Sequence, residues 1–311
     1  MELCNIGEIR RLLEKYDLKP KKGYGQNFLT NPAIPARIAE SSAFGNNSYD
    51  VSDSLRSADA ALEIGPGLGC LTKELAMRFD KVVAVEIDTA LIPLLSESLG
   101  EFDNVSIINA DFMELDLNKF FSQNFDGKTV HVAANLPYYI TTPVLMKLLE
   151  FIPQPSSPKI ATITAMVQLE VADRICAAAG TPDYGAVTAA VNLRGTARKL
   201  FTVSAGNFLP VPKVDSAVIE IALYENGLHG AYPGFPEDDA EACTMLAGVK
   251  ELISLGFGQR RKTLSNTLSK RHPKNVVESS LEEIGFPRDV RGERLSATDF
   301  CRLYEEIGKH I

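Results

Sequence analysis

Between residues 60 and 179, short apolar segments of strand length alternate with segments that have helical periodicity. Strands that alternate with helices form a mostly parallel sheet covered by helices on both faces. The pattern therefore predicts an α/β fold. The expected strands are 60–64, 82–85, 105–108, 130–134 and 160–167, and the expected helices are 71–78, 90–99, 143–151 and 169–179.

The pattern changes in the C-terminal part of the chain. Segments 186–194 and 216–223 look like strands with no long helix between them, which predicts an antiparallel hairpin at one edge of the sheet. Residues 240–311 show helical periodicity only, with Ser265 and Ser296 as expected N-caps. We therefore expect an α/β domain over 1–230 and a small all-helical domain over 231–311. Further expected features are helices at 8–16 and 32–42, a loop at 44–59 and a linker at 226–239.

A glycine-rich motif follows the first of the alternating strands. Residues 65–69 hold three glycines with the spacing GxGxG, which lets the backbone approach a ligand closely. The dinucleotide fingerprint GxGxxG needs glycine at position 70, where this chain has Cys70, so NAD is disfavoured. Glu86 ends the second strand and can accept hydrogen bonds from ribose hydroxyls. Asp111 follows the third strand and can accept one from an adenine amine, so we expect S-adenosylmethionine as a methyl donor here.

The segment Asn135-Leu136-Pro137-Tyr138 follows the fourth strand, at the same edge of the sheet. An adenine N6 amine is a poor nucleophile, so methylation requires it to be held in line while acceptors engage its N–H groups. The Asn135 side chain and the Leu136 carbonyl supply two such acceptors. Pro137 fixes the turn and Tyr138 offers a face for stacking an unstacked base. Alone, the segment is also typical of an ordinary β-to-α loop; beside a donor site it favours adenine methylation.

Composition excludes several other classes of protein. The five cysteines are scattered, and no histidine has a partner at metal-ligand spacing, so we expect no disulfide framework and no metal. No apolar run reaches the roughly 18 residues of a membrane span, and the N-terminus is charged, so we expect a cytoplasmic protein. The net charge of −8 counts against a nucleic-acid partner. However, residues 249–275 hold seven Lys and Arg against one acid, Glu251, and a local basic surface attracts RNA.

Six ordered motifs resemble those of the small-subunit ribosomal RNA adenine dimethyltransferases, from about residue 19 to residue 300. They are GQNFL at 25–29, EIGPGLG at 63–69, VEID at 85–88, NLPYY at 135–139, FLPVPKVDSA at 208–217 and FGQRRKTL at 257–264. The resemblance implies a seven-stranded methyltransferase (Rossmann-like) sheet with a helical C-terminal domain. It also implies dimethylation of the N6 amines of two adjacent adenines in the 3′-terminal hairpin loop of small-subunit rRNA.

The resemblance also implies roles for single residues. Tyr138 and Phe208 would sandwich the flipped adenine beside the catalytic segment 135–137. The implied donor pocket contains Gln26, Asn27, Leu29, Gly65, Gly67, Glu86, Asp111 and Asn135. The dense basic run, which alone is also typical of a solvated face, makes Arg260, Arg261, Lys262, Lys270 and Arg271 the expected RNA contacts. We expect a monomer that binds an immature small ribosomal subunit and contributes to its biogenesis.

Two other functions stay open. Related enzymes that methylate large-subunit rRNA and confer antibiotic resistance share the donor site and the NxPY segment, but by family resemblance lack the segment 259–264. A non-catalytic ribosome assembly factor would need the RNA-binding surface only. The intact Glu86, Asp111, Asn135 and Tyr138 argue against a vestigial pocket.

Overall fold

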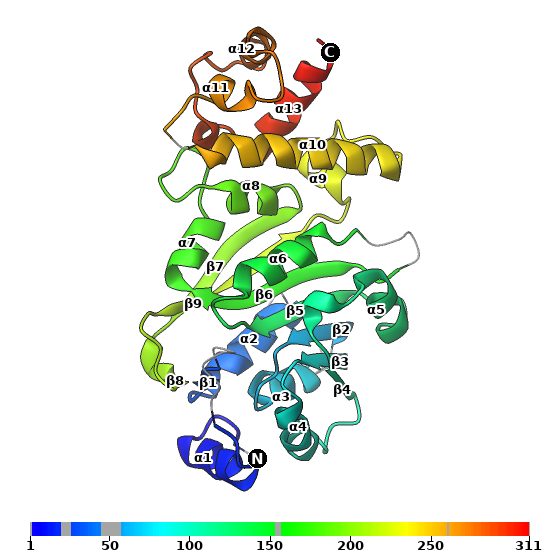
Figure 1. The fold of residues 1–311 in the computed structure, drawn as a ribbon. Coiled ribbons are helices and arrows are strands. Elements are labelled where there is room, and N and C mark those ends of the chain that lie inside the picture. Colours follow the sequence, from blue (N-terminus) through cyan, green and yellow to red (C-terminus); the bar gives the residue numbers. More distant parts are fainter. Residues whose placement is uncertain (1, 20–25, 45–56, 153–156, 260, 311) are drawn as a thin grey trace. The chain divides into compact units, whose positions relative to one another are not determined.

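The computed structural model of the chain describes residues 2–19, 26–44, 57–152, 157–259 and 261–310. They form two compact units (Figure 1). Unit 1 contains Met1–Ala172 and Arg198–Ala222, and unit 2 contains Asp173–Ala197 and Leu223–Ile311. Unit 2 thus includes a segment that precedes the domain boundary expected at residue 230. No helix in the described ranges is both long and apolar enough to span a membrane.

The main sheet has seven strands in the order β4-β3-β2-β5-β6-β9-β7 (Figure 1). The strands are β2 (Ser57–Ile64), β3 (Phe79–Glu86), β4 (Val105–Asn109), β5 (Val130–Asn135), β6 (Ile160–Gln168), β7 (Gly195–Val203) and β9 (Ser216–Leu223). The first five are parallel, and β9 pairs antiparallel with β6. All five strands expected in the alternating region are confirmed. Apart from the edge strand β4, their apolar runs, such as Val82 to Val85 in β3, are largely buried because helices cover both faces of the sheet.

Helices pack on both faces of this sheet. On one face, Ile38 of α2 (Ala33–Phe44) and Leu75 of α3 (Cys70–Ala76) join a core with Ala61 of β2. On the other lie α5 (Leu117–Asn124) and α6 (Thr141–Glu150) (Figure 1). The N-terminal helix α1 (Ile6–Lys15) buries Ile9 and Leu12 in a cluster with residues of α4 (Ile92–Ser98). Among the described residues, three short 3₁₀ turns lie in unit 1, namely η2 (Thr89–Leu91), which precedes α4, η3 (Phe112–Glu114) and η4 (Ala205–Asn207). Another, η5 (Gly292–Arg294), lies in unit 2.

A second, two-stranded sheet was not expected from the sequence. Strand β1 (Phe28–Leu29) pairs antiparallel with β8 (Phe208–Leu209), with Phe28 opposite Leu209 and Leu29 opposite Phe208. The pairing brings the GQNFL motif beside the FLPVPKVDSA motif, although almost 180 residues separate them. Two-residue strands carry too little periodicity to be predicted locally.

Unit 2 is helical in its C-terminal part, as expected. Its helices there are α9 (Leu228–Ala231), α10 (Asp239–Gly258), α11 (Leu264–Leu268), α12 (Lys274–Glu283) and α13 (Ala297–Gly308). Ser296 caps α13, since its side chain accepts a hydrogen bond from the Asp299 N–H at 3.1 Å. The prediction that Ser265 is an N-cap is wrong. Thr263 holds that position, and Ser265 is buried inside the helix with its hydroxyl bonded to the Arg288 carbonyl.

The strand predicted over residues 186–194 is also wrong. Residues Ala186–Asn192 form helix α8, and the strand of this region, β7, begins at Gly195. Helix α8 packs against α10 and α13 and buries Thr188, Ala189 and Val191. Packing against these helices outweighs the β-propensity of Val187, Thr188 and Val191. Of segment 169–179, which was expected to be helical, residues Leu169–Ile175 form helix α7 and the last four residues do not.

The strand order fixes where a ligand can bind. The chain runs outward through β2, β3 and β4, and then returns to place β5 on the other side of β2. Ile64 at the end of β2 lies opposite Ala134 near the end of β5. The loops that leave these two strands therefore diverge at a topological switch point, which is where open α/β sheets bind ligands.

Candidate active site

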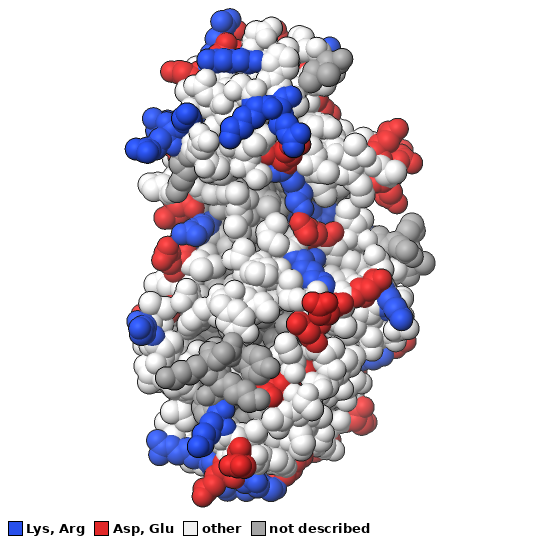
Figure 2. Space-filling model, viewed as in Figure 1, with Lys and Arg blue, Asp and Glu red and all other residues white. Residues whose placement is uncertain are grey.

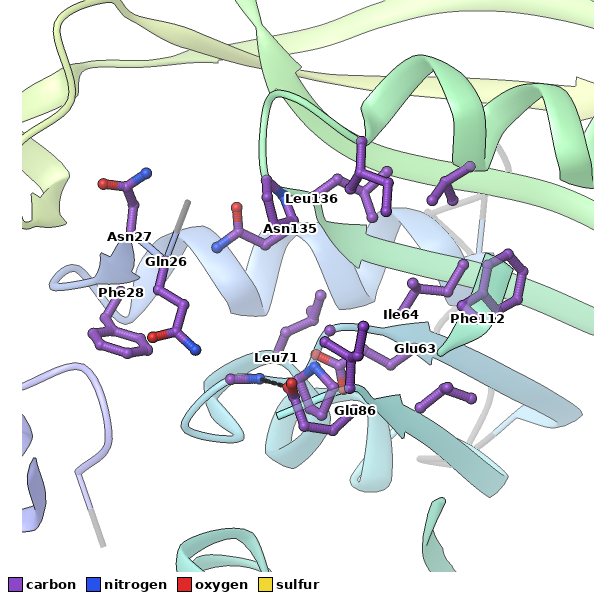
Figure 3. Close-up of a pocket in the computed structure, with 18 of the residues that line it drawn as sticks. Gln26, Asn27, Phe28, Glu63, Ile64, Leu71, Glu86, Phe112, Asn135 and Leu136 are labelled. Carbon is purple, nitrogen blue, oxygen red and sulfur yellow. Dashed lines mark hydrogen bonds between the residues drawn. The ribbon is translucent and has the colours of Figure 1, made fainter. Parts of the chain in front are cut away.

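A cavity of about 1150 Å³, part of it open to solvent, lies within unit 1 where β2, β3 and β5 end (Figure 3). All the residues predicted to hold the donor or the target line this one cavity. They are Gln26, Asn27, Leu29, Gly65, Gly67, Glu86, Asp111, Asn135, Leu136, Pro137, Tyr138 and Phe208. Six stretches of chain that are distant in sequence thus meet in one place.

The glycine loop lies open to the cavity. Its first residue is tied to β3 by a hydrogen bond of 3.0 Å from the Gly65 N–H to the Val85 carbonyl. Gly65 has a φ of 72°, which favours glycine, and a Cβ atom added there would meet nothing within 4 Å. At Gly67, where φ is 58°, a Cβ would come within 3.6 Å of the Phe28 ring. The loop therefore leaves backbone and empty space for a bound molecule.

Glu86 is held in place by the same loop. Its carboxylate accepts hydrogen bonds from the Gly67 N–H at 3.2 Å and from the Asp88 N–H at 2.8 Å. Asp88 in turn accepts one from the Gln26 side chain at 3.2 Å. Burial raises the pKa of Glu86 above its ordinary value, although the backbone donors oppose this. Hydroxyl groups of a ligand that donated to this carboxylate would relieve the cost of its burial.

Glu63 is a second buried acid in the lining, and no role was predicted for it. Burial raises the pKa of Glu63 to about 8, and within the described chain its Oε2 atom has no hydrogen-bond partner. In Figure 3 Glu63 and Glu86 lie near each other, below Ile64, and the charge of Glu86 contributes to the raised pKa of Glu63. The sequence signal for this acid is its position two residues before Gly65, at the end of a buried strand.

The charge of the lining separates classes of ligand. Among its described residues it has three carboxyl groups, on Glu63, Glu86 and Asp111, and no Lys or Arg. Such a lining disfavours phosphate groups and suits a cation that also carries hydroxyls. Phe28 and Phe112 add apolar surface that can pack against a purine ring. S-adenosylmethionine, with its sulfonium, ammonium, ribose and adenine groups, fits this combination.

The segment from Asn135 to Tyr138 leaves β5 in a fixed turn. The Pro137 carbonyl accepts hydrogen bonds from the Ile140 N–H at 3.1 Å and from the Thr141 hydroxyl at 3.2 Å. Figure 3 shows the Asn135 side chain directed from the end of β5 toward the space that Gln26 faces from the other side. The Tyr138 hydroxyl shares a hydrogen bond of 2.9 Å with Ser216 Oγ, which ties this aromatic ring to β9.

Phe208 reaches the cavity from β8. It is buried in the core of unit 1 and also lines the cavity. Its place opposite Leu29 in the β1–β8 pairing explains why residues of the GQNFL motif line the same cavity. The cavity thus contains aromatic side chains from both the Tyr138 and the Phe208 segments.

The predicted RNA contacts belong to unit 2. Arg261, Lys262, Lys270 and Arg271 are exposed. Figure 2 shows Lys and Arg side chains in number over the α11–α12 part of this unit. Arg271 forms an ion pair of 3.0 Å with Glu251, so part of the local positive charge is neutralised. Arg260 lies outside the described residues. In the described ranges there is no group of three or more His, Cys, Asp and Glu side chains that could hold a metal ion.

Comparisons with known proteins agree with this site. The ribosomal RNA adenine dimethylase family matches residues 17–309. The ribosomal RNA small subunit methyltransferase A of Alkaliphilus oremlandii is 36% identical over 305 residues, which cover 97% of this chain and 96% of that protein. The protein of the same name from Shouchella clausii is 38% identical, with coverage of 98% and 96%.

Two solved structures have the same fold. The 23S rRNA methyltransferase ErmE has a TM-score of 0.63 and 27% identity, and the match covers 91% of this chain and all of that one. A dimethyladenosine transferase from Plasmodium falciparum has a TM-score of 0.68 and 24% identity, with coverage of 90% and 97%.

The fold and the cavity thus define a methyltransferase that uses S-adenosylmethionine as its methyl donor. More specifically, the chain belongs to the ribosomal RNA adenine dimethylase family, and it is an rRNA adenine dimethyltransferase.

Proposed function

We propose that this enzyme dimethylates the N6 amines of two adjacent adenines in the 3′-terminal hairpin loop of small-subunit rRNA. One observation carries the proposal: the Asn135–Tyr138 turn and Phe208 open into the same cavity as the donor motif. The relatives that are 36–38% identical over nearly their full length are small-subunit enzymes by name, which supports the choice of subunit.

In the proposed donor site, the carboxylate of Glu86 receives the two ribose hydroxyls. Its two backbone hydrogen bonds fix the direction in which the remaining lone pairs point. Asp111 receives the adenine amine of the donor, and Phe112 beside it packs against the ring. Gln26, Asn27, Leu29, Gly65, Gly67 and Asn135 complete the pocket. S-adenosylmethionine, when bound, supplies an electrophilic methyl group on a positively charged sulfur.

In the proposed target site, Tyr138 and Phe208 stack on the two faces of the flipped adenine. The Asn135 side-chain oxygen and the Leu136 carbonyl accept hydrogen bonds from the N6 amine. These contacts hold the nitrogen in line with the methyl group and increase the electron density on it. Pro137 keeps both acceptors in position, since two hydrogen bonds to its carbonyl close the turn.

The substrate is proposed to be rRNA within an immature small subunit, bound by a monomer through Arg261, Lys262, Lys270 and Arg271, together with Arg260. Exposed Lys and Arg side chains bind phosphates in a salt-dependent manner. Bacterial ribosomal subunits are assembled in the cytoplasm, and the bacterial origin of the relatives therefore supports that compartment. A role in small-subunit biogenesis follows from such a substrate.

The test compares three substrates with labelled donor: undermethylated small subunits, large subunits and naked rRNA. We expect labelled N6,N6-dimethyladenosine at adjacent positions of small-subunit rRNA only. Label in large-subunit rRNA would instead support the antibiotic-resistance function, which the 27% identity to a 23S rRNA enzyme leaves as the second candidate.

A further inference from the structure

Two cysteine thiols that are distant in sequence meet beside the donor cavity. Cys70 is the first residue of α3, directly after Gly69, and it lines the cavity. Its thiol lies 3.1 Å from the Leu3 carbonyl oxygen, within hydrogen-bond range. Cys4, the residue after Leu3, is buried and packs in the same apolar cluster as Cys70. The two thiols perturb each other, which lowers the pKa of Cys4 and raises the pKa of Cys70. Both thiols are free, and both belong to unit 1.

A second cavity gives small molecules access to this pair. It has a volume of about 1070 Å³, is partly open to solvent, and is lined by both Cys4 and Cys70. The neighbouring Cys70 thiol lowers the pKa of the Cys4 thiol, although burial opposes the shift. The thiolate is the form of cysteine that reacts with oxidants, so Cys4 is the more reactive of the two.

We propose that Cys4 and Cys70 are a thiol-oxidation site, where a hydroperoxide forms a disulfide that joins the N-terminal segment to the donor loop and weakens donor binding. The Cys4 thiolate attacks one peroxide oxygen, the O–O bond breaks, and Cys4 becomes a sulfenic acid. The Cys70 thiol then attacks that sulfur, the S–S bond forms and water leaves. With hydrogen peroxide, two thiols lose two electrons and two protons, and the peroxide becomes two waters. A thiol reductant reverses the reaction.

The disulfide acts on the donor site through the glycine loop. An S–S bond is about 2.05 Å long, which is shorter than any non-bonded contact between two sulfur atoms, so its formation draws Cys4 and Cys70 together and shifts the start of α3. Three residues before Cys70, the Gly67 N–H donates the 3.2 Å hydrogen bond that orients Glu86. We therefore expect affinity for S-adenosylhomocysteine to fall about tenfold, which corresponds to loss of about one hydrogen bond.

The same bond stabilises the fold. It closes a long loop between residues 4 and 70, which restricts the unfolded chain, so the thermal midpoint should rise. A higher midpoint together with weaker donor binding distinguishes this disulfide from general oxidative damage, which lowers both.

The experiment uses the full-length protein, treated with hydrogen peroxide and then with catalase. We expect a Cys4–Cys70 linked peptide, about tenfold weaker calorimetric binding of S-adenosylhomocysteine, a higher thermal midpoint, and recovery of all three values with dithiothreitol. Cys4→Ser, with Cys4→Ala as a second variant, should bind as the reduced protein does and lose the response. Cys243→Ser, at an exposed thiol, is the matched control and should keep the response.

Three results would overturn the proposal: no linked peptide, a linked peptide with affinity unchanged within twofold, or a Cys4→Ser protein that responds like the wild type. Donor binding by the reduced wild-type protein tests the donor assignment independently of the oxidation site. If the reduced protein fails to bind S-adenosylhomocysteine, the donor assignment fails rather than the oxidation site.

Discussion

Glu63 makes the stability of the protein depend on pH in a predictable direction. Its carboxyl group is fully buried in β2, and burial raises its pKa from 4.5 to about 8. The folded state therefore holds a proton that the unfolded chain releases above about pH 4.5. Stabilisation from this group is complete below that pH and is lost as the pH rises to about 8.

Glu63→Gln removes this dependence because its amide stays neutral. Each pH unit between the two pKa values changes the unfolding free energy by about 1.4 kcal/mol. The stability of the variant minus that of the wild type should therefore increase by about 3 kcal/mol between pH 5.5 and 8, and then level off.

Urea unfolding of the ligand-free proteins at about pH 5.5, 6.5, 7.5, 8.5 and 9 measures this difference. Glu101→Gln, at a side chain that is 61% exposed, controls for the loss of one negative charge. A difference between Glu63→Gln and wild type that stays constant over the whole range would refute the reasoning, because a buried carboxylic acid must titrate.

Three further predictions concern the ligands. Glu86→Ala should weaken calorimetric binding of S-adenosylhomocysteine by about 10- to 100-fold, since charge-assisted hydrogen bonds to the ribose are lost; unchanged affinity would contradict the ribose assignment. Tyr138→Ala should lower kcat/KM for RNA by about 10- to 100-fold, whereas Tyr138→Phe, which keeps the stacking ring, should cost less than about fivefold. Replacing both Arg261 and Lys262 with Ala should reduce the slope of log affinity against log salt by about 1.4. Arg288→Ala serves as the control, and a double variant with the same slope as the wild type would show that these two side chains do not contact the RNA.

Much of the fold follows from local patterns in the sequence. The inner strands β2, β3, β5 and β6 are largely buried, so their apolar runs are continuous and easily recognised. The edge at which the glycine loop and the Asn135 turn meet follows from the parallel arrangement alone. All the residues expected to hold donor or target do line one cavity.

The rest depends on contacts between distant segments, which local periodicity does not encode. Helix α8 contains β-branched residues that suggested a strand, and it is held as a helix by the packing of α10 and α13 against it. The pairing of β1 with β8, which brings Phe208 beside Leu29, involves two residues in each strand. Cys4 and Cys70 look scattered in the sequence, and their contact exists only in the folded chain.

The central claim is that one cavity binds the methyl donor and presents an adenine amine to it through Asn135. The most direct test is mass-spectrometric quantification of N6,N6-dimethyladenosine in undermethylated small subunits incubated with donor and either wild type or Asn135→Ala. We predict that the wild type forms dimethyladenosine and that the variant forms it at least about 100-fold more slowly, because an oriented acceptor matters most in the transition state. The affinity of the variant for S-adenosylhomocysteine should stay within about threefold of the wild-type value. The central claim would be contradicted if the wild type formed no dimethyladenosine while a control enzyme did. It would also be contradicted if Asn135→Ala formed dimethyladenosine as fast as the wild type.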